Sequence, residues 1–339
     1  MNERPPRHDI GPARALRIGI IGARRARQGL GPFVAKWLAC HGARVVAHAG
    51  TSLTTVAEAT ADLARVAGVD ARGYVGAASM LAAEALDAVA ILSPPEHHGA
   101  ALDACLAAGV HVLCEKPLLA PDVAAPSQAA RVRALEDGFA ERGRVLWENC
   151  QWPRTLATYR ALFPECAAVP RTFAMGLEPA SRGAAMLSDA LSHPLSLLQA
   201  LLGDEVEVSE IGCTLGPATT NEARAAYDLS FRAQGPAGAV QARVALRHAP
   251  EQPRRAWYAL DGLRAERTVR LSDYAMQLSD GPRSVALPDP LELHLSAFLR
   301  AIAEAPPQAA RRGERLASRA LSARMAALEA LIACAAPKR

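Results

Sequence analysis

Between Leu16 and Cys150, short apolar runs rich in β-branched residues alternate with longer helical stretches, and this rhythm restricts the possible fold most strongly. A strand, a helix and a second strand in this order form a βαβ unit, which builds a parallel sheet. The predicted strands are Arg17–Ile21, Arg44–Ala47, Ala88–Leu92, His111–Cys114 and Val145–Glu148. The predicted helices are Phe33–Cys40, Thr54–Val66, Gly99–Ala108 and Ser127–Glu141, and a glycine that can end the helix follows each one closely. We therefore predict a doubly wound α/β domain.

The rhythm changes after Trp152-Pro153. The pattern there predicts one helix, Ala184–Leu202, followed by the strands Val206–Thr214, Ala226–Ala233, Val240–His248, Trp257–Asp261 and Thr268–Leu271, with Gly and Pro turns between them. Two final helices, Leu291–Ala305 and Gly313–Ala335, can pack back on either domain. We predict a flexible tail at 1–14, an α/β domain at 15–150 and an α+β domain with a large, mostly antiparallel open sheet at 151–339.

Composition narrows the classes of partner. The net charge is +4, basic residues are spread through both halves, and aromatic residues make up only 4%, so nothing indicates a nucleic-acid-binding surface. No segment approaches the roughly 18 consecutive apolar residues of a membrane span. The seven cysteines form no CxxC pairs, which indicates reduced thiols, no metal site and a cytoplasmic protein. We expect small-molecule partners, with neither nucleic acid nor membrane.

The first strand ends in Gly19-Ile20-Ile21-Gly22, where a dinucleotide-binding Rossmann domain makes its phosphate turn. A complete glycine fingerprint starting at Gly22 would continue with glycines where Arg24 and Arg27 stand. Gly19 and Gly22 are therefore candidate cofactor residues. The alternative is that Gly22 only permits a tight turn.

The loop after Gly22 is also longer than usual, because Gly31-Pro32 resembles a helix N-cap and first helical position. Phosphate contacts would then pass partly to the side chains of Arg24, Arg25 and Arg27, since a guanidinium can hold two phosphate oxygens at once. A solvated, flexible basic loop is the competing interpretation.

The end of the second strand bears on the choice of cofactor. The segment His48–Ser52 lacks the Asp or Glu that would bind a ribose 2′-hydroxyl and repel a 2′-phosphate. Hydroxyls from Thr51 and Ser52 beside an arginine-rich loop favour NADP, with NAD still possible. Ser52 can equally serve as the N-cap of the next helix.

Two further turns follow neighbouring strands of the predicted sheet. Ser93-Pro94-Pro95-Glu96-His97-His98 comes after one strand, and Glu115-Lys116-Pro117 comes after the next. Ligands of such sheets bind outside the carboxyl ends of the strands, so both turns are predicted at the nicotinamide end of the cofactor. Ser93, Pro94, His98, Glu115 and Lys116 are therefore candidate cofactor contacts, although His98 can instead be purely structural.

These features together resemble the glucose–fructose oxidoreductase, inositol dehydrogenase and rhizopine catabolism (Gfo/Idh/MocA) family. The resemblance is carried by Gly19–Gly22, the Pro95–His98 turn, the specific Gly109–Leu118 segment and a weaker match at Asp189–His193. It implies that Lys116 lies near nicotinamide and substrate, and that Asp189 and His193 complete the catalytic set from the second domain. It also implies a homo-oligomer, a dimer or tetramer, paired through the second sheet.

The four-residue gap between Asp189 and His193 puts both side chains on one face of a helix. A histidine near its unperturbed pKa can take the proton of a hydroxyl that loses hydride, and Lys116 can stabilise the developing alkoxide. Asp189 would orient His193 or bind a second hydroxyl. Structural alternatives are that Asp189 caps a helix and that His193, before Pro194, marks a helix boundary.

Asn149, Gln151 and Trp152 follow the last predicted strand of the first domain, at the junction where a substrate pocket forms. Two amides beside an indole suit a sugar or cyclitol, whereas Trp152 can also serve only in junction packing. The chain departs from the family pattern at Leu191, Ser196 and Gln151-Trp152, which leaves the substrate open.

We predict an NADP(H)-dependent oxidoreductase acting on a sugar, a cyclitol or a related carbonyl or alcohol. One alternative is a catalytically silent cofactor sensor of the same fold. The other is a glycosidase or epimerase that uses bound NAD(P) for internal redox.

Overall fold

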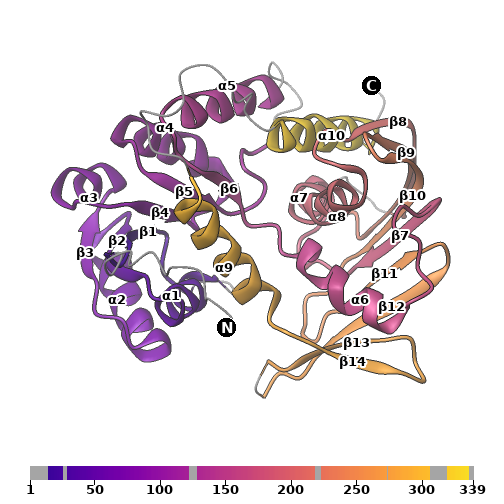
Figure 1. Cartoon of the computed structure of the whole chain (residues 1–339), viewed down its shortest axis with the longest axis horizontal. Coiled ribbons are helices and arrows are strands. Elements are labelled where there is room, and N and C mark those ends of the chain that lie inside the picture. The colour runs from indigo at the N-terminus through magenta and orange to yellow at the C-terminus, as the bar shows by residue number, and fades with distance from the viewer. Residues whose placement is uncertain are drawn as a thin grey trace, which may run out of the picture.

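The computed structural model describes residues 14–25, 29–121, 128–217, 223–272, 274–305 and 319–335. Within these ranges the chain folds around two sheets, each with its own helices (Figure 1). The predicted tail lies outside the described residues except for Arg14, and so does Arg27 of the first loop. Among the described helices, none is long and apolar enough to cross a membrane.

The first sheet is parallel and has six strands in the order β3-β2-β1-β4-β5-β6. The strands are β1 (Arg17–Ile21), β2 (Arg44–Gly50), β3 (Arg72–Val75), β4 (Ala88–Ile91), β5 (His111–Cys114) and β6 (Leu146–Glu148). This order is that of dinucleotide-binding sheets, in which the direction of winding reverses between β1 and β4. The carboxyl ends of β1 and β4 therefore flank the crevice in which such sheets bind their ligands.

Helices cover both faces of this sheet. One face packs on α1 (Gly31–Cys40) and α2 (Leu53–Ala67), and the other on α3 (Ala77–Ala83), α4 (His98–Ala108) and α5 (Gln128–Glu141). Helix α9 (Pro290–Ala303), far along the chain, joins the first face, where Leu295 and Phe298 are buried with Ile18 and Ile20 of β1. Because both faces are covered, the central strands β1, β4 and β5 are mainly apolar.

The second sheet has eight strands in the order β14-β13-β12-β11-β7-β10-β9-β8. The strands are β7 (Thr172–Leu177), β8 (Glu207–Leu215), β9 (Ala226–Gly235), β10 (Gly238–Arg247), β11 (Ala256–Leu260), β12 (Leu263–Val269), β13 (Met276–Ser279) and β14 (Ser284–Leu287). Neighbours are antiparallel except β7 and β10. The predicted fold class, a doubly wound parallel sheet followed by a large, mostly antiparallel sheet, is confirmed.

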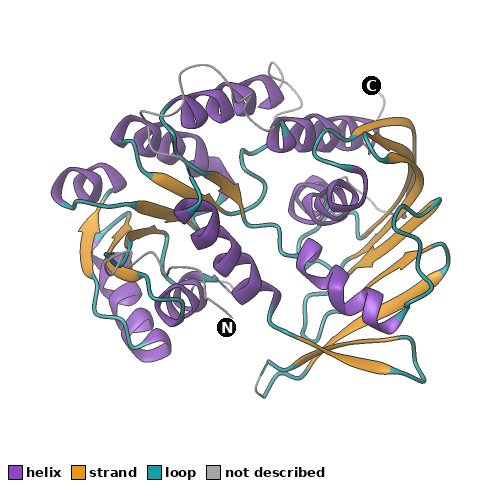
Figure 2. Cartoon of the chain, viewed as in Figure 1, coloured by secondary structure: helices purple, strands orange, loops and turns teal. Residues whose placement is uncertain are grey.

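One face of the second sheet is buried and the other is exposed. In β9, Leu229 and Phe231 are buried, whereas Ser230 between them is exposed and Arg232 after them is partly exposed. Figure 2 shows the helices of this domain on the side of the sheet that faces the first domain. They are α6 (Leu156–Leu162), α7 (Gly183–Ala190), α8 (Ser192–Leu202) and α10 (Ala320–Ala335).

The structure differs from the sequence prediction at several elements. The helix predicted over Ala184–Leu202 is two helices, α7 and α8, that meet at Leu191. Pro194 explains the break, because it has no N–H to donate to the carbonyl of Ala190, four residues earlier. Strands β3, β7, β13 and β14 and helices α3 and α6 were not predicted. The predicted start of the last helix at Gly313 lies outside the described residues, and the described part begins at Ala320.

Candidate active site between the two domains

The turn after β1 brings the ends of three strands together. The Gly22 amide donates to the carbonyl of Ala49 at 3.0 Å, and Gly22 has φ +80. A Cβ at Gly22 would lie 2.7 Å from the backbone nitrogen of Ser93, so a glycine is needed for close approach as well as for conformation. A Cβ at Gly31 would lie 2.1 Å from the carbonyl oxygen of Ala23. The close backbone packing at Gly22 and Gly31, here called the glycine cradle, lies beside the N-terminus of α1, which suits a cofactor diphosphate.

Two details of this loop correct the sequence prediction. Gly31 is the first residue of α1 rather than its cap, because Leu30 occupies the cap position. Gly19 lies in the middle of β1, where a Cβ would meet Leu86 and Met80, so it is a glycine of sheet packing and not a cofactor contact.

Arg24 and Arg25 of this loop are at the surface. A guanidinium nitrogen of Arg24 lies 2.6 Å from Glu58 of α2, and both side chains are nearly half exposed. The guanidinium of Arg25 lies 4.8 Å from the centre of the Phe33 ring. An exposed pair such as Arg24–Glu58 contributes at most about 1 kcal/mol, so a phosphate can displace the carboxylate.

At the end of β2, the Ser52 hydroxyl accepts a hydrogen bond from the Thr55 amide at 3.2 Å and caps α2. The capping interpretation of Ser52 is therefore confirmed. Thr51 is exposed beside it and leaves a hydroxyl available at the position of the ribose.

His98 ties the two turns at the nicotinamide end together. Its Nδ1 lies 3.0 Å from the carbonyl of Pro117 and its Nε2 lies 2.7 Å from the carbonyl of Ser93. The ring is fully buried, and this burial lowers the pKa of His98. His98 thus positions the turns from beneath instead of touching the cofactor. Ser93 Oγ is buried with no hydrogen-bond partner in the described part of the chain, which leaves it available to a bound cofactor, beside the exposed Pro94.

Lys116 reaches across from the first domain to the second. Its Nζ donates to Asp189 Oδ1 at 2.5 Å and to the Asp189 carbonyl at 2.6 Å, and the Lys116 side chain is 14% exposed. Burial acts to raise the pKa of Asp189, but the charge and hydrogen bond of Lys116 outweigh it, so that pKa lies below its ordinary value. The pair is therefore ionised, and it fixes the lysine beside the domain junction. Of the two roles predicted for Asp189, orienting His193 by a hydrogen bond is not seen among the contacts of the described residues, because the Asp189 carboxylate accepts from Lys116 and Ser181 instead.

His193 lies in the first turn of α8, with its ring edge-on to Trp152 at a centroid distance of 6.3 Å. Burial and the positive charge of Lys116 lower its pKa well below 6.5, while Asp189 acts in the opposite direction. The prediction of a nearly unperturbed pKa is therefore wrong. The consequence is a neutral imidazole at physiological pH, able to accept a proton, with Nδ1 buried and without a partner among the residues described.

The three predicted substrate residues have different surroundings. The Asn149 amide is buried and donates to Glu115 Oε1, which makes it a support for the turn before Lys116. Burial raises the pKa of Glu115, and Lys116 and Asn149 oppose that shift. Gln151 donates to Asn149 Oδ1 at 3.4 Å and is half-buried. Of the three, Trp152 is the one with a ring against His193.

Sequence reasoning missed several groups at this junction. Ser181 donates to Asp189 Oδ2 at 3.4 Å, and the guanidinium of Arg267 lies over the Trp152 ring at 4.8 Å. Behind His193, Arg324 of α10 forms an ion pair with the buried carboxylate of Glu148. The signal for Arg267 is a charge at an inward-facing position of an alternating strand, but the predicted strand began too late, at Thr268, to include it.

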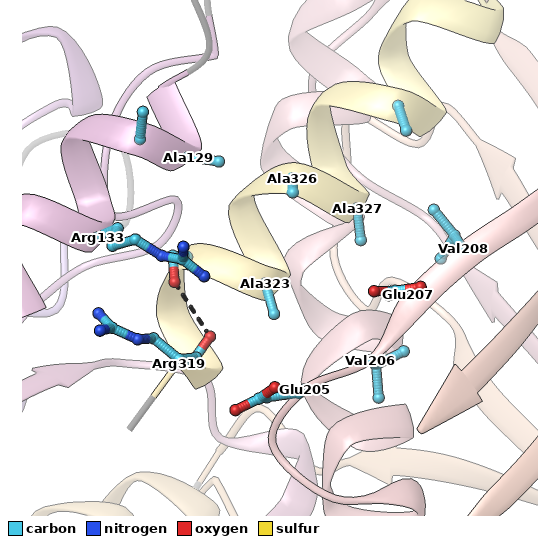
Figure 3. A pocket seen from close by; sticks show the side chains of 13 residues that line it. Ala129, Arg133, Glu205, Val206, Glu207, Val208, Arg319, Ala323, Ala326 and Ala327 are labelled. Atoms are coloured by element: carbon cyan, nitrogen blue, oxygen red, sulfur yellow. Dashed lines mark hydrogen bonds between the residues drawn. The ribbon is translucent and has the colours of Figure 1, made fainter. Parts of the chain in front are cut away.

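Two cavities lie away from Lys116, Asp189 and His193. Figure 3 shows one of about 570 Å³ beside α10, lined mainly by small apolar side chains such as Ala129, Ala323 and Val206. The other, about 1270 Å³, is lined by residues that include Trp147 and His294. Neither cavity is lined by Lys116, Asp189 or His193. The candidate active site therefore rests on side-chain geometry at the junction of the domains.

The strand order, the glycine cradle and the ionised lysine at the carboxyl edge of the sheet define a dinucleotide-binding oxidoreductase type of domain. Residues 16–149 match the family model described as "Oxidoreductase family, NAD-binding Rossmann fold". This match to the Gfo/Idh/MocA model covers the first domain and agrees with the resemblance seen in the sequence.

Individual proteins resemble the chain in part of its sequence or in its fold. Inositol 2-dehydrogenase of Leifsonia xyli subsp. xyli is 40% identical over 93 residues, which span 27% of this chain and 26% of that protein. Over the whole fold, UDP-N-acetylglucosamine 3-dehydrogenase from Acidithiobacillus ferrooxidans gives a TM-score of 0.65 at 22% identity, covering 94% of this chain and 97% of that one. A variant 3-ketoreductase from Actinomadura kijaniata, in complex with TDP-benzene and NADP, gives 0.64 at 22% identity, covering 94% and 96%. These two structures share the two-domain fold.

Proposed function

We propose that the protein is an NADP(H)-dependent oxidoreductase that moves hydride between the nicotinamide and a sugar, a cyclitol or a related carbonyl or alcohol. The observation that carries the proposal is the Lys116–Asp189 pair, which joins the two domains beside His193 at the ligand-binding edge of the parallel sheet. The relatives named above are two dehydrogenases and a ketoreductase, and the names of the two dehydrogenases contain a cyclitol and a sugar nucleotide.

The residues of this chain fit the cofactor. The cradle of Gly22 and Gly31 would take the diphosphate, and Ser93 Oγ with the Glu115-Lys116 turn would border the nicotinamide. The bound nicotinamide supplies the acceptor of the hydride. Protein side chains hold the alcohol and accept its proton.

In the direction of oxidation, Lys116 holds the reacting hydroxyl and stabilises negative charge on its oxygen, while Asp189 keeps the ammonium in place. Neutral His193 takes the hydroxyl proton as the C–H bond breaks. The lowered pKa of His193 favours this direction at neutral pH, because the imidazole starts as a base and not as an acid.

NADP is proposed over NAD for two reasons. Thr51 and Ser52, which follow β2, provide no carboxylate, and Arg24 forms an ion pair with Glu58 of α2, the helix that Ser52 caps. A 2′-phosphate dianion would replace Glu58 as the partner of Arg24. A neutral ribose hydroxyl would not compete for that guanidinium.

The test is a fluorescence titration of the purified protein with NADPH and with NADH, followed by a panel of sugars, cyclitols and keto compounds assayed at 340 nm. We expect NADPH to bind more tightly and at least one polyol class to be turned over. Absence of binding for both cofactors would overturn the proposal. Binding without turnover would favour a sensor, and conversion without net change in absorbance would favour internal redox.

We also propose a cytoplasmic homo-oligomer. The seven cysteines are all free thiols, which suits a reducing compartment. The outer face of the second sheet is polar and carries the exposed pairs Arg247–Asp228 and Arg255–Glu266. If copies pair through this face, the interface is salt-sensitive, and light scattering at low and high salt measures it.

A further inference from the structure

Arg267 is an arginine on the inner face of the second sheet. Side chains alternate along β12, so Arg267 shares a face with the fully buried Ala265, whereas Arg264 and Glu266 lie on the opposite face. The backbone register pairs Arg267 with Ala256, which in turn pairs with Leu177. Leu177 ends β7, and the segment after it leads to Ser181 and the Asp189 carboxylate. The topology therefore brings Arg267 to the edge of the sheet that faces the catalytic cluster.

The charge of Arg267 is not neutralised by the protein. In the described part of the chain no carboxylate lies within ion-pair distance of its guanidinium, and its Nε is buried without a hydrogen-bond partner. Its guanidinium lies over the face of the Trp152 ring, with the guanidinium carbon 4.8 Å from the ring centre. Burial and the neighbouring positive charge of Arg254 lower the pKa of Arg267 to about 10, so it stays cationic at neutral pH.

Two other cations at the junction have carboxylate partners. Lys116 pairs with Asp189, and Arg324 pairs with Glu148. The Arg267 side chain is partly exposed, but its buried Nε has no partner, and a buried polar group without a hydrogen bond costs stability. A carboxylate or phosphate of a ligand can satisfy a guanidinium with two parallel hydrogen bonds. The position of Arg267 also acts on the chemistry, since its charge is one of those that lower the pKa of His193.

We propose that Arg267 binds an oxyanion carried by the substrate itself, so that the preferred substrate is a monosaccharide-sized polyol bearing a carboxylate or a phosphate. This inference rests on the proposed function, because it describes the occupant of the same site. The guanidinium of Arg267 lies 4.8 Å from the centre of the Trp152 ring, and the His193 ring lies 6.3 Å from the same ring, so both groups border one side chain at the domain junction. A substrate of sugar size that places its reacting hydroxyl at Lys116 and His193 can place its anion on Arg267.

Substrate binding would then also prepare the base. An anion beside Arg267 cancels a positive charge that acts on His193, and this raises the affinity of the imidazole for a proton. A neutral polyol in the same position leaves that charge in place. Anionic substrates should therefore show a higher kcat as well as a lower KM than their neutral counterparts.

The test compares matched sets on the NADP⁺-loaded full chain: glucose, glucuronate and glucose 6-phosphate, then galactose with its uronate and phosphate, then myo-inositol with its monophosphate. Turnover is followed at 340 nm and binding by calorimetry. We expect one anionic member to bind most tightly, and Arg267→Gln to raise its KM about 10- to 100-fold with the neutral member unaffected. Whether the carboxylates or the phosphates respond identifies the oxyanion. Arg267→Lys, which keeps the charge but not the two-pronged geometry, should recover part of the loss.

Arg264→Gln is the matched control, because Arg264 lies on the opposite face of the same strand, stacked at 4.1 Å on Trp257. It should leave every KM unchanged. Neutral members turned over as well as anionic ones, or equal losses for both in Arg267→Gln, would overturn the inference while leaving the oxidoreductase in place. Failure of cofactor titration would instead overturn the proposed function. NADPH titration of Arg267→Gln checks that this variant folds, and if it does not, Arg267→Lys decides by the same comparison.

Discussion

Replacing Lys116 by alanine separates catalysis from cofactor binding. In the structure the ammonium is 14% exposed and lies 2.5 Å from Asp189 Oδ1, so it acts in a partly desolvated site. Two unit charges about 4 Å apart at an effective dielectric constant of about 20 interact by about 4 kcal/mol. The Asp189 carboxylate already offsets part of that field, which leaves about 3 kcal/mol for a developing alkoxide. We therefore expect Lys116→Ala to lower kcat roughly 100-fold.

Cofactor affinity should change little, because the lysine contributes mostly in the transition state. The assay pairs steady-state kinetics at 340 nm with NADPH fluorescence titration on the same preparations. Lys36→Ala is the control, since Lys36 is an exposed lysine of α1 whose ammonium lies over the Trp37 ring. Loss of NADPH affinity as large as the loss of kcat would refute the assigned role and make Lys116 a cofactor-binding residue.

Three further outcomes follow from the geometry. Gly22→Ala and Gly42→Ala both force alanine to positive φ, which costs about 1–2 kcal/mol of folding stability. Only at Gly22 does the added Cβ meet the Ser93 backbone, so urea unfolding should show a further loss of about 1–3 kcal/mol for Gly22→Ala, together with weakened NADPH binding. Equal losses of stability in the two variants would contradict this. Arg24→Ala should weaken NADPH binding about 10-fold and leave NADH affinity unchanged, while the free energy of unfolding stays within about 0.5 kcal/mol. A parallel loss of affinity for both cofactors would remove the argument for NADP. The rate of alcohol oxidation should stay level as pH falls through 6.5 and decline only well below it, because His193 has a lowered pKa and loses its base form only there; a pH–rate limb at 6.5 that is absent in His193→Gln would show an unperturbed histidine.

Strands and helices with a clear local sequence pattern were predictable, whereas strands that depend on pairing with a neighbouring strand were not. The central strands β1, β4 and β5 are continuous apolar runs, and glycines at positive φ end α2 and α4 as the sequence indicated. Strand β3 is a short, mostly exposed edge strand with an arginine and a glycine, and β13 and β14 are four residues each. Such strands are specified by pairing with a partner strand, which local periodicity does not record.

The catalytic candidates show the same division. The sequence determined that a lysine follows β5 at the ligand-binding edge of a parallel sheet, because strand direction and the position of the turn fix that edge. It also determined the four-residue spacing of Asp189 and His193. Only the tertiary structure decided that Asp189 pairs with Lys116, 73 residues away, and leaves His193 neutral. Only the second sheet brought Arg267 over Trp152, because charge, burial and ring contacts act through space between residues that the sequence keeps far apart.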